Sequence, residues 1–265
     1  MLSEAEHLLD HAAEHRGSLA AAAAGPRWSS PAWLIVTAYY WAFFSAMALG
    51  RATGRFVWQL GRDTVHRFEG LGPPSPRRQG AGPYRVVLGA RVSATHREID
   101  VHRVNDRLHE AVWRQMFDYL IVTWREHGDE AANSLEFRAI EAFERIRNNL
   151  GADWPSAVRN SVNYRTGFAY EAVKGGDFYG LTAVARDSRG WNEQLAIDAL
   201  EEAGVALRPG QTVLQRPFLF CRMLLLCGFL LNSAATTLVS EVLDRHGLDR
   251  RWREARARFL EALLA

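Results

Sequence analysis

The stretch PAWLIVTAYYWAFFSAMALG, residues 31–50, decides the fold class of this chain. It is apolar on nearly every side of a helix, and Ser29, Ser30 and Pro31 provide a typical N-cap and first helical position. A helix without a polar face is typical of the centre of a helical bundle. We therefore expect a central helix that begins at Pro31 and continues to about Leu60.

Apolar residues at helical spacing predict further helices on both sides of this segment. The helix before it begins near Glu4, where Ser3 and Glu6 form a capping box, and ends near Ala23. The helices expected after it cover residues 105–127, 129–149, 154 to about 170, 187–204, 217–243 and 249–264. The sequence thus predicts a mostly α-helical protein, a multi-helix bundle in which residues 1–265 form a single domain.

A different pattern interrupts the helices between residues 69 and 103. Residues 72–78 read GPPSPRR, a composition that breaks both helices and strands. Residues 84–88 and 91–101 have β character on either side of a Gly-Ala pair, as expected for a hairpin. We therefore expect an inserted loop and a small β-hairpin over residues 69–103.

Arginine dominates the basic residues, because Lys174 is the only lysine among 32 basic side chains. Arginine can bind phosphate in a bidentate manner, and residues 62–97 hold seven arginines against two acids. Four of them are candidates for contacts with nucleic acid, namely Arg77, Arg78, Arg85 and Arg91. The alternative is a solvated loop with the arginine bias of a GC-rich genome, since the net charge of +2 gives no global attraction.

The cysteines and the apolar segments bear on the cellular compartment. Cys221 and Cys227 lie six residues apart in an expected helix, on nearly opposite faces, so we expect no disulfide and a reducing environment. Residues 31–50 and 217–231 are apolar enough to suggest membrane spans, but the first contains polar aromatic residues and the second contains Arg222. We expect a cytoplasmic, soluble protein, with a membrane-associated helical protein as an alternative.

The sequence contains no phosphate loop, GxSxG elbow, HExxH or GxGxxG motif. The candidate binding residues come from the segment RNSVNYR, and they are Arg159, Asn160, Asn163, Tyr164 and Arg165. All of them donate hydrogen bonds, so together they could bind phosphate, ribose or a carboxylate. Because Trp154 and Pro155 mark a helix start, we expect this polar site beside the central helix, near Tyr39 and Tyr40. The alternative is a polar network that only joins helices.

Three histidines, His7, His11 and His15, follow one another at intervals of four residues on the first expected helix. This spacing allows two of them to share a metal ion on one helix face. The sequence identifies no further ligands. We therefore expect a solvated helix face and no metal or cofactor.

The opening helix with Glu6-His7-Leu8-Leu9, followed by the helix segment AYYWAFFSA at 38–46, resembles the start of HEPN-type helical bundles. This superfamily is widespread in bacterial toxin, antiphage and RNA-processing proteins, and the resemblance covers about half of the chain. Its members carry an arginine, a polar residue, and a histidine four to six residues beyond the arginine. Arg159 and Asn160 match the first two positions, but Tyr164 follows where the histidine is required.

The resemblance implies RNA cleavage only where that histidine is present, and a phenol with a pKa of about 10 is a poor proton shuttle. We therefore expect a non-catalytic HEPN-like subunit of a bacterial defence or RNA-associated system. Its partner would be a protein from the same operon, another copy of the chain, or RNA. The alternative is a metal-independent endoribonuclease that uses Arg159 with Tyr164, or Arg103 with His109, although Val104 occupies the polar position of the latter pair.

Overall fold

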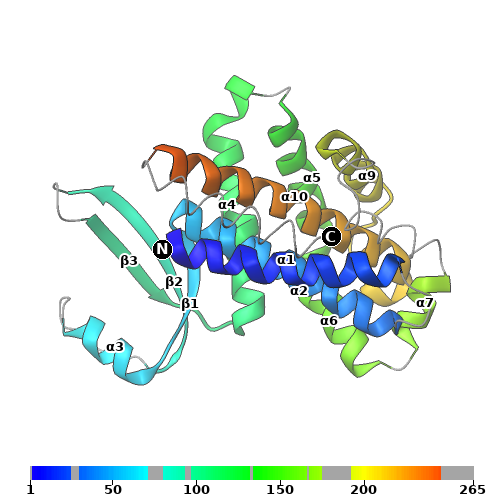
Figure 1. Ribbon diagram of the computed structural model, residues 1–265, viewed down its shortest axis with the longest axis horizontal. Coiled ribbons are helices and arrows are strands. Elements are labelled where there is room, and N and C mark those ends of the chain that lie inside the picture. The colour runs from blue at the N-terminus through cyan, green and yellow to red at the C-terminus, as the bar shows by residue number, and fades with distance from the viewer. Residues whose placement is uncertain are drawn as a thin grey trace.

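The structure is a computed structural model that describes residues 2–24, 30–70, 80–92, 97–131, 134–165, 167–174 and 192–245. The helix expected at 249–264 lies outside these residues, as do Arg77 and Arg78. Within the described ranges the chain is mostly helical with a small antiparallel sheet (Figure 1). The predicted fold class, a multi-helix bundle with a small β element, is therefore confirmed.

The predicted helices are present among the described residues, but α3 and β1 were not predicted, and the helix expected from 154 to about 170 is divided into α6 and α7. The helices are α1 (Leu2–Ala24), α2 (Pro31–Thr53), α3 (Arg62–Glu69), α4 (Leu108–Ala131), α5 (Leu135–Leu150), α6 (Trp154–Tyr164), α7 (Phe168–Lys174), α9 (Glu193–Val205) and α10 (Pro217–Arg245). The strands are β1 (Arg55–Leu60), β2 (Gly82–Arg91) and β3 (Arg97–Arg103). A short 3-10 turn covers Val213–Gln215.

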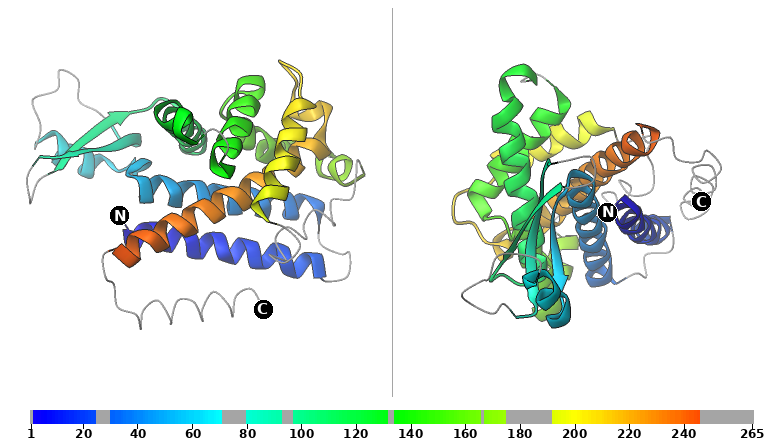
Figure 2. Two further views of the ribbon diagram at one scale, coloured as in Figure 1. Left: turned by 90° about the horizontal axis from the view of Figure 1, so that it is seen from above. Right: turned by 90° about the vertical axis from the view of Figure 1, so that its left-hand side faces the viewer.

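The apolar helix α2 occupies the centre of the bundle, as its sequence predicts. Helices α1 and α10 pack along it, and α4, α6 and α7 also contact it (Figures 1 and 2). Tyr39 and Trp41 of α2 are fully buried in the main core. Burial of the apolar surface that these packed helices share is the main source of stability in such a bundle.

Helix α2 ends at Thr53, so the expectation that it continues to Leu60 is wrong. Gly54 follows it with φ 74°, a left-handed conformation, and its N–H donates to the carbonyls of Gly50 and Arg51. Glycine is the usual residue at such a helix end, because it has no Cβ to clash there. Residues 55–60 then form a strand, because a short apolar and aromatic run fits a strand as well as it fits a helix.

The sheet therefore has three strands in the order β1-β2-β3, where the sequence predicted a two-stranded hairpin. It lies at one end of the bundle, together with α3 (Figure 1). A small separate core joins α3 to the sheet, and it contains Leu60, Val65, Tyr84 and Val101. Val57 of β1 instead belongs to the main core, which anchors the sheet to the bundle.

Helices α2 and α10 are long and apolar enough to cross a bilayer, judged by length and composition among the described residues. Their most apolar windows are 67% and 61% buried inside the protein, and core helices of soluble bundles pass the same criterion. Cys221 and Cys227, both in α10, are buried and unpaired with each other, as expected from their spacing.

Candidate functional site

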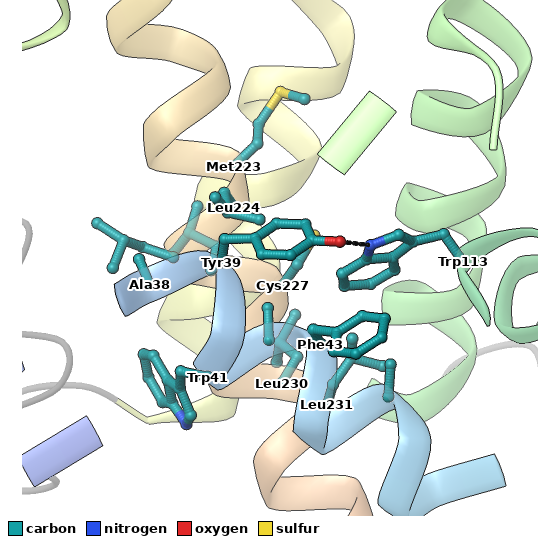
Figure 3. Close-up of a cluster of buried hydrophobic side chains, with 14 of the residues drawn as sticks. Ala38, Tyr39, Trp41, Phe43, Trp113, Met223, Leu224, Cys227, Leu230 and Leu231 are labelled. Atoms are coloured by element: carbon teal, nitrogen blue, oxygen red, sulfur yellow. Dashed lines mark hydrogen bonds between the residues drawn. The ribbon is translucent and has the colours of Figure 1, made fainter. Parts of the chain in front are cut away.

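A hydrogen-bonded cluster forms where α2, α4 and α6 meet, and Tyr39 is its centre. The hydroxyl oxygen of Tyr39 lies 2.8 Å from Nδ1 of His109, 3.2 Å from Nε1 of Trp113 and 3.4 Å from Oγ of Ser156. Figure 3 shows the Tyr39 hydroxyl directed at the Trp113 indole. Tyr39, Trp113 and Ser156 are buried, and His109 is partly exposed.

The direction of each hydrogen bond in this cluster follows from the chemistry of its members. The indole N–H of Trp113 can only donate, so the Tyr39 oxygen accepts from it. Burial raises the pKa of Tyr39 to about 12, so the phenol keeps its proton at neutral pH and donates it. The nearer acceptor is Nδ1 of His109. When Tyr39 donates to this nearer acceptor, His109 carries its own proton on Nε2, the nitrogen on the other side of the ring.

His109 is held as a neutral imidazole. Its ring stacks on Phe43 with 4.3 Å between the ring centroids. Burial and, after it, the positive charge of Arg159 lower the pKa of His109 below the ordinary value of 6.5. At neutral pH, Nε2 of His109 is consequently a hydrogen-bond donor.

Arg159 of α6 lies against Tyr40, in the part of the central helix where the polar site was expected. One of its terminal nitrogens donates to the Tyr40 hydroxyl at 3.3 Å, and the other donates to Oδ1 of Asn160 at 3.4 Å. Its Nε is buried and has no hydrogen-bond partner in the part of the chain that the structure describes. Both accepting oxygens are neutral, whereas the partly exposed Arg138 and Arg147 bind carboxylates. Among the described residues, the guanidinium of Arg159 therefore lacks the counter-charge that such groups normally have.

The expected solvated helix face is found at His7, which is exposed, whereas the partly exposed His11 and His15 also pack against α2. The ring of His15 stacks on Tyr40 at 5.5 Å and on Phe44 at 5.6 Å, and the ring of His11 lies 5.2 Å from Phe44. Burial lowers the pKa of His15, with Glu14 opposing that shift and His11 adding to it. Within the described ranges no group of three side chains could hold a metal ion.

The structure brings together only part of the predicted five-residue site. Arg159 lies next to the Tyr39 cluster and is hydrogen-bonded to Asn160. The other three residues are exposed at the end of α6, namely Asn163, Tyr164 and Arg165. Tyr164 is 80% exposed. It therefore points into solvent and does not take the place of a catalytic histidine beside Arg159.

Arg103 and His109 lie in different surroundings. Arg103 is on β3, where its guanidinium lies near Gly80 and Gly82. His109 is on α4, where Tyr39 and Arg159 act on it. The arginine that faces His109 is thus Arg159.

The four arginines predicted to contact nucleic acid can be placed only in part. Arg85 is exposed on β2. Arg91 ends β2, where its backbone pairs with Arg97, and its side chain is outside the described part of the structure. Arg77 and Arg78 also lie outside it.

Sequence reasoning missed the buried members of the cluster. Tyr39 is separated by 70 residues from His109, by 74 from Trp113 and by 117 from Ser156. No local spacing connects residues at such separations. The one available signal is that a tyrosine in an apolar helix needs a hydrogen-bond partner when it is buried.

Comparison with protein-family models, with curated proteins and with solved structures found no match to this chain. The fold and the cluster together define a helical-bundle protein with a partly exposed group of hydrogen-bond donors. The donors are Nε2 of His109, the hydroxyl of Tyr40 and the guanidinium of Arg159. Such an arrangement favours an anionic ligand.

Proposed function

We propose that this protein is a non-catalytic, HEPN-like helical subunit that binds RNA, and that the donor cluster contacts a phosphate group. The observation that carries the proposal is Arg159, whose buried Nε has no partner within the described ranges and whose two hydrogen bonds go to neutral oxygens. A buried donor without a partner costs roughly 1–3 kcal/mol, and more when the group is charged. A phosphate group at the partly exposed guanidinium would supply the counter-charge.

The tautomer of His109 supports binding over cleavage. A general base must offer an unprotonated nitrogen, but Nδ1 accepts from Tyr39 and Nε2 carries the proton. The exposed position of Tyr164 likewise supports a non-catalytic role, because this phenol lies away from the cluster. With the proton on Nε2 of His109, the cluster stabilises a bound anion without removing a proton from it.

The second candidate is a metal-independent endoribonuclease, and one observation favours it. His109 and Arg159 act on one another across two helices, which places an acid–base side chain beside a phosphate-binding one. Incubation of the full chain with total RNA in EDTA tests this candidate. Cleavage that disappears in His109→Ala, with unchanged melting, would replace the binding proposal by the ribonuclease.

The binding proposal is tested by fluorescence anisotropy with a labelled single-stranded RNA. We expect Arg159→Ala to weaken binding at least tenfold, about 1.4 kcal/mol or more, because the phosphate contact is lost. Arg145→Ala is the matched control, since Arg145 is a partly exposed arginine of α5 that pairs with Glu141 of the same helix. It should change the affinity less than twofold. Equal effects of the two substitutions would contradict a site at Arg159.

The arginines of the insertion are tested separately by replacing Arg77, Arg78, Arg85 and Arg91 with serine. If they contact phosphates, the variant should bind RNA more weakly and with a flatter dependence of affinity on salt. The slope of log Kd against log salt concentration measures this. An unchanged slope would assign the segment to a solvated loop. If no RNA binds at all, the RNA-binding proposal is wrong, and a protein partner is the alternative.

A further inference from the structure

The hydroxyl of Tyr39 lies between two acceptors, and this arrangement serves two protonation states of His109. When His109 is neutral, Tyr39 donates to its Nδ1 at 2.8 Å. When His109 is protonated, Nδ1 donates instead, and the Tyr39 proton can turn to Oγ of Ser156 at 3.4 Å. The phenol oxygen can then accept from both His109 and Trp113. Every hydrogen bond around Tyr39 is therefore satisfied in either state.

The charged groups around His109 determine whether its ring is neutral or protonated. Tyr39 and Tyr40 face it from α2, and Arg159 faces it from α6, where Ser156 lies on the other side of the Tyr39 hydroxyl. Glu110 is its neighbour on α4, but Arg159 is the charged group that shifts its pKa. An anion beside Arg159 would offset that positive charge and favour the imidazolium. A bound anion and a proton on His109 would thus stabilise one another.

Resting on the RNA-binding function proposed above, we propose that the cluster takes a dianionic phosphate monoester and that His109 takes up one proton from solvent when it binds. Arg159 and protonated His109 together supply two positive charges. A phosphate monoester carries a charge of about −1.5 to −2 at neutral pH, whereas an internal RNA phosphodiester carries one negative charge. The ligand would therefore be the terminal phosphate of an RNA, a mononucleotide or free phosphate, which share this chemistry.

Isothermal titration calorimetry on the full chain can separate these sources. The probes are one short RNA with either a 5′-phosphate or a 5′-hydroxyl, adenosine monophosphate, and inorganic phosphate. Titration in two buffers with different ionisation enthalpies measures proton uptake. We expect at least tenfold tighter binding of the phosphorylated RNA, with net proton uptake at neutral pH. The affinity should fall by up to about tenfold per pH unit above pH 7, the limit for one linked proton.

Ser156→Ala removes the second acceptor for the Tyr39 proton. Ser161→Ala is the matched control, because Ser161 is buried on the same helix. Both variants should melt close to the wild type by circular dichroism. We expect Ser156→Ala to lose the proton uptake and the pH dependence of phosphorylated RNA binding, and Ser161→Ala to retain both. A wild-type pH slope in Ser156→Ala would overturn the proposal.

The outcomes distinguish this inference from the RNA-binding function beneath it. If both RNAs bind equally and Arg159→Ala weakens both, RNA binding stands and the monoester site is wrong. If the mononucleotide or phosphate binds with proton uptake but RNA does not, the monoester site stands and RNA binding is wrong. If none of the probes binds, both proposals are wrong.

Discussion

The guanidinium carbon of Arg51 lies 3.8 Å from the ring centre of Phe56, directly over the aromatic face. The same side chain donates to the carboxylate of Glu4 at 3.1 Å and to the backbone carbonyl of Val57 at 3.2 Å. Arg51 is buried, so one side chain of α2 holds both the first turn of α1 and strand β1. Arg51 therefore combines an ion pair, a cation–π contact and a hydrogen bond to a backbone carbonyl.

We expect Arg51→Ala to lower the free energy of unfolding by about 2–4 kcal/mol, because it leaves the Val57 carbonyl without its donor and removes a cation–π contact. Urea denaturation measures the change. Glu4→Gln is the control, since Glu4 is half exposed and an exposed ion pair contributes about 0–1 kcal/mol. Similar losses in both variants would mean that the ion pair with Glu4 provides most of the stabilisation by Arg51.

Gly54 is the residue that separates α2 from β1. Its φ is 74°, and an added Cβ would lie 3.2 Å from side-chain atoms of Leu88. Gly54→Ala should therefore lower the free energy of unfolding by about 1–2 kcal/mol through backbone strain and crowding. At Gly61 an added Cβ meets nothing within 4 Å, so Gly61→Ala should be nearly neutral. Thermal unfolding of both variants compares them, and equal melting temperatures would contradict the strain at Gly54.

The Tyr39 hydroxyl should also contribute to stability. Tyr39→Phe leaves Nε1 of Trp113 and Nδ1 of His109 without their partner in a buried place. We expect a loss of roughly 1–3 kcal/mol in urea denaturation. Tyr164→Phe removes the same hydroxyl at an 80% exposed position and should change the free energy of unfolding by less than about 0.5 kcal/mol. A neutral Tyr39→Phe would show that the cluster does not hold the helices together.

The stability of the unliganded protein should decrease on mild acidification. Burial lowers the pKa of both His15 and His109 below 6.5, so near that pH the unfolded chain binds protons that the folded chain does not. The free energy of unfolding is therefore not reduced by these histidines above pH 6.5. It decreases as the pH falls from there to their pKa values in the folded protein. The melting temperature between about pH 7.5 and 5.5 measures this loss.

The double variant His15→Gln, His109→Gln should show a flatter pH dependence of melting than the wild type. His66→Gln is the control, because His66 is exposed on α3, away from the cluster. It should keep the wild-type dependence. A double variant that also keeps it would show that other groups cause the acid sensitivity.

Sequence patterns predicted the helices well because each pattern is local. The apolar run of α2 placed it in the centre, and the Trp-Pro pair at 154–155 correctly marked the start of α6. The pattern failed at residues 55–60, where six residues suit a helix or a strand and pairing with β2 decides between them. It failed again for Tyr164, because the end of α6 leaves that side chain in solvent.

By itself, the sequence determined that this chain forms a helical bundle, because the spacing of apolar residues specifies which face of each helix must be buried. Only the tertiary structure decided that His109 is paired with Tyr39 and faces Arg159. Those contacts join three helices across large sequence separations, and they depend on how the helices pack. Packing also determines the burial that lowers the pKa of His109 and leaves Nε of Arg159 without a partner. The chemistry of the candidate site therefore arises from long-range packing, which no local pattern encodes.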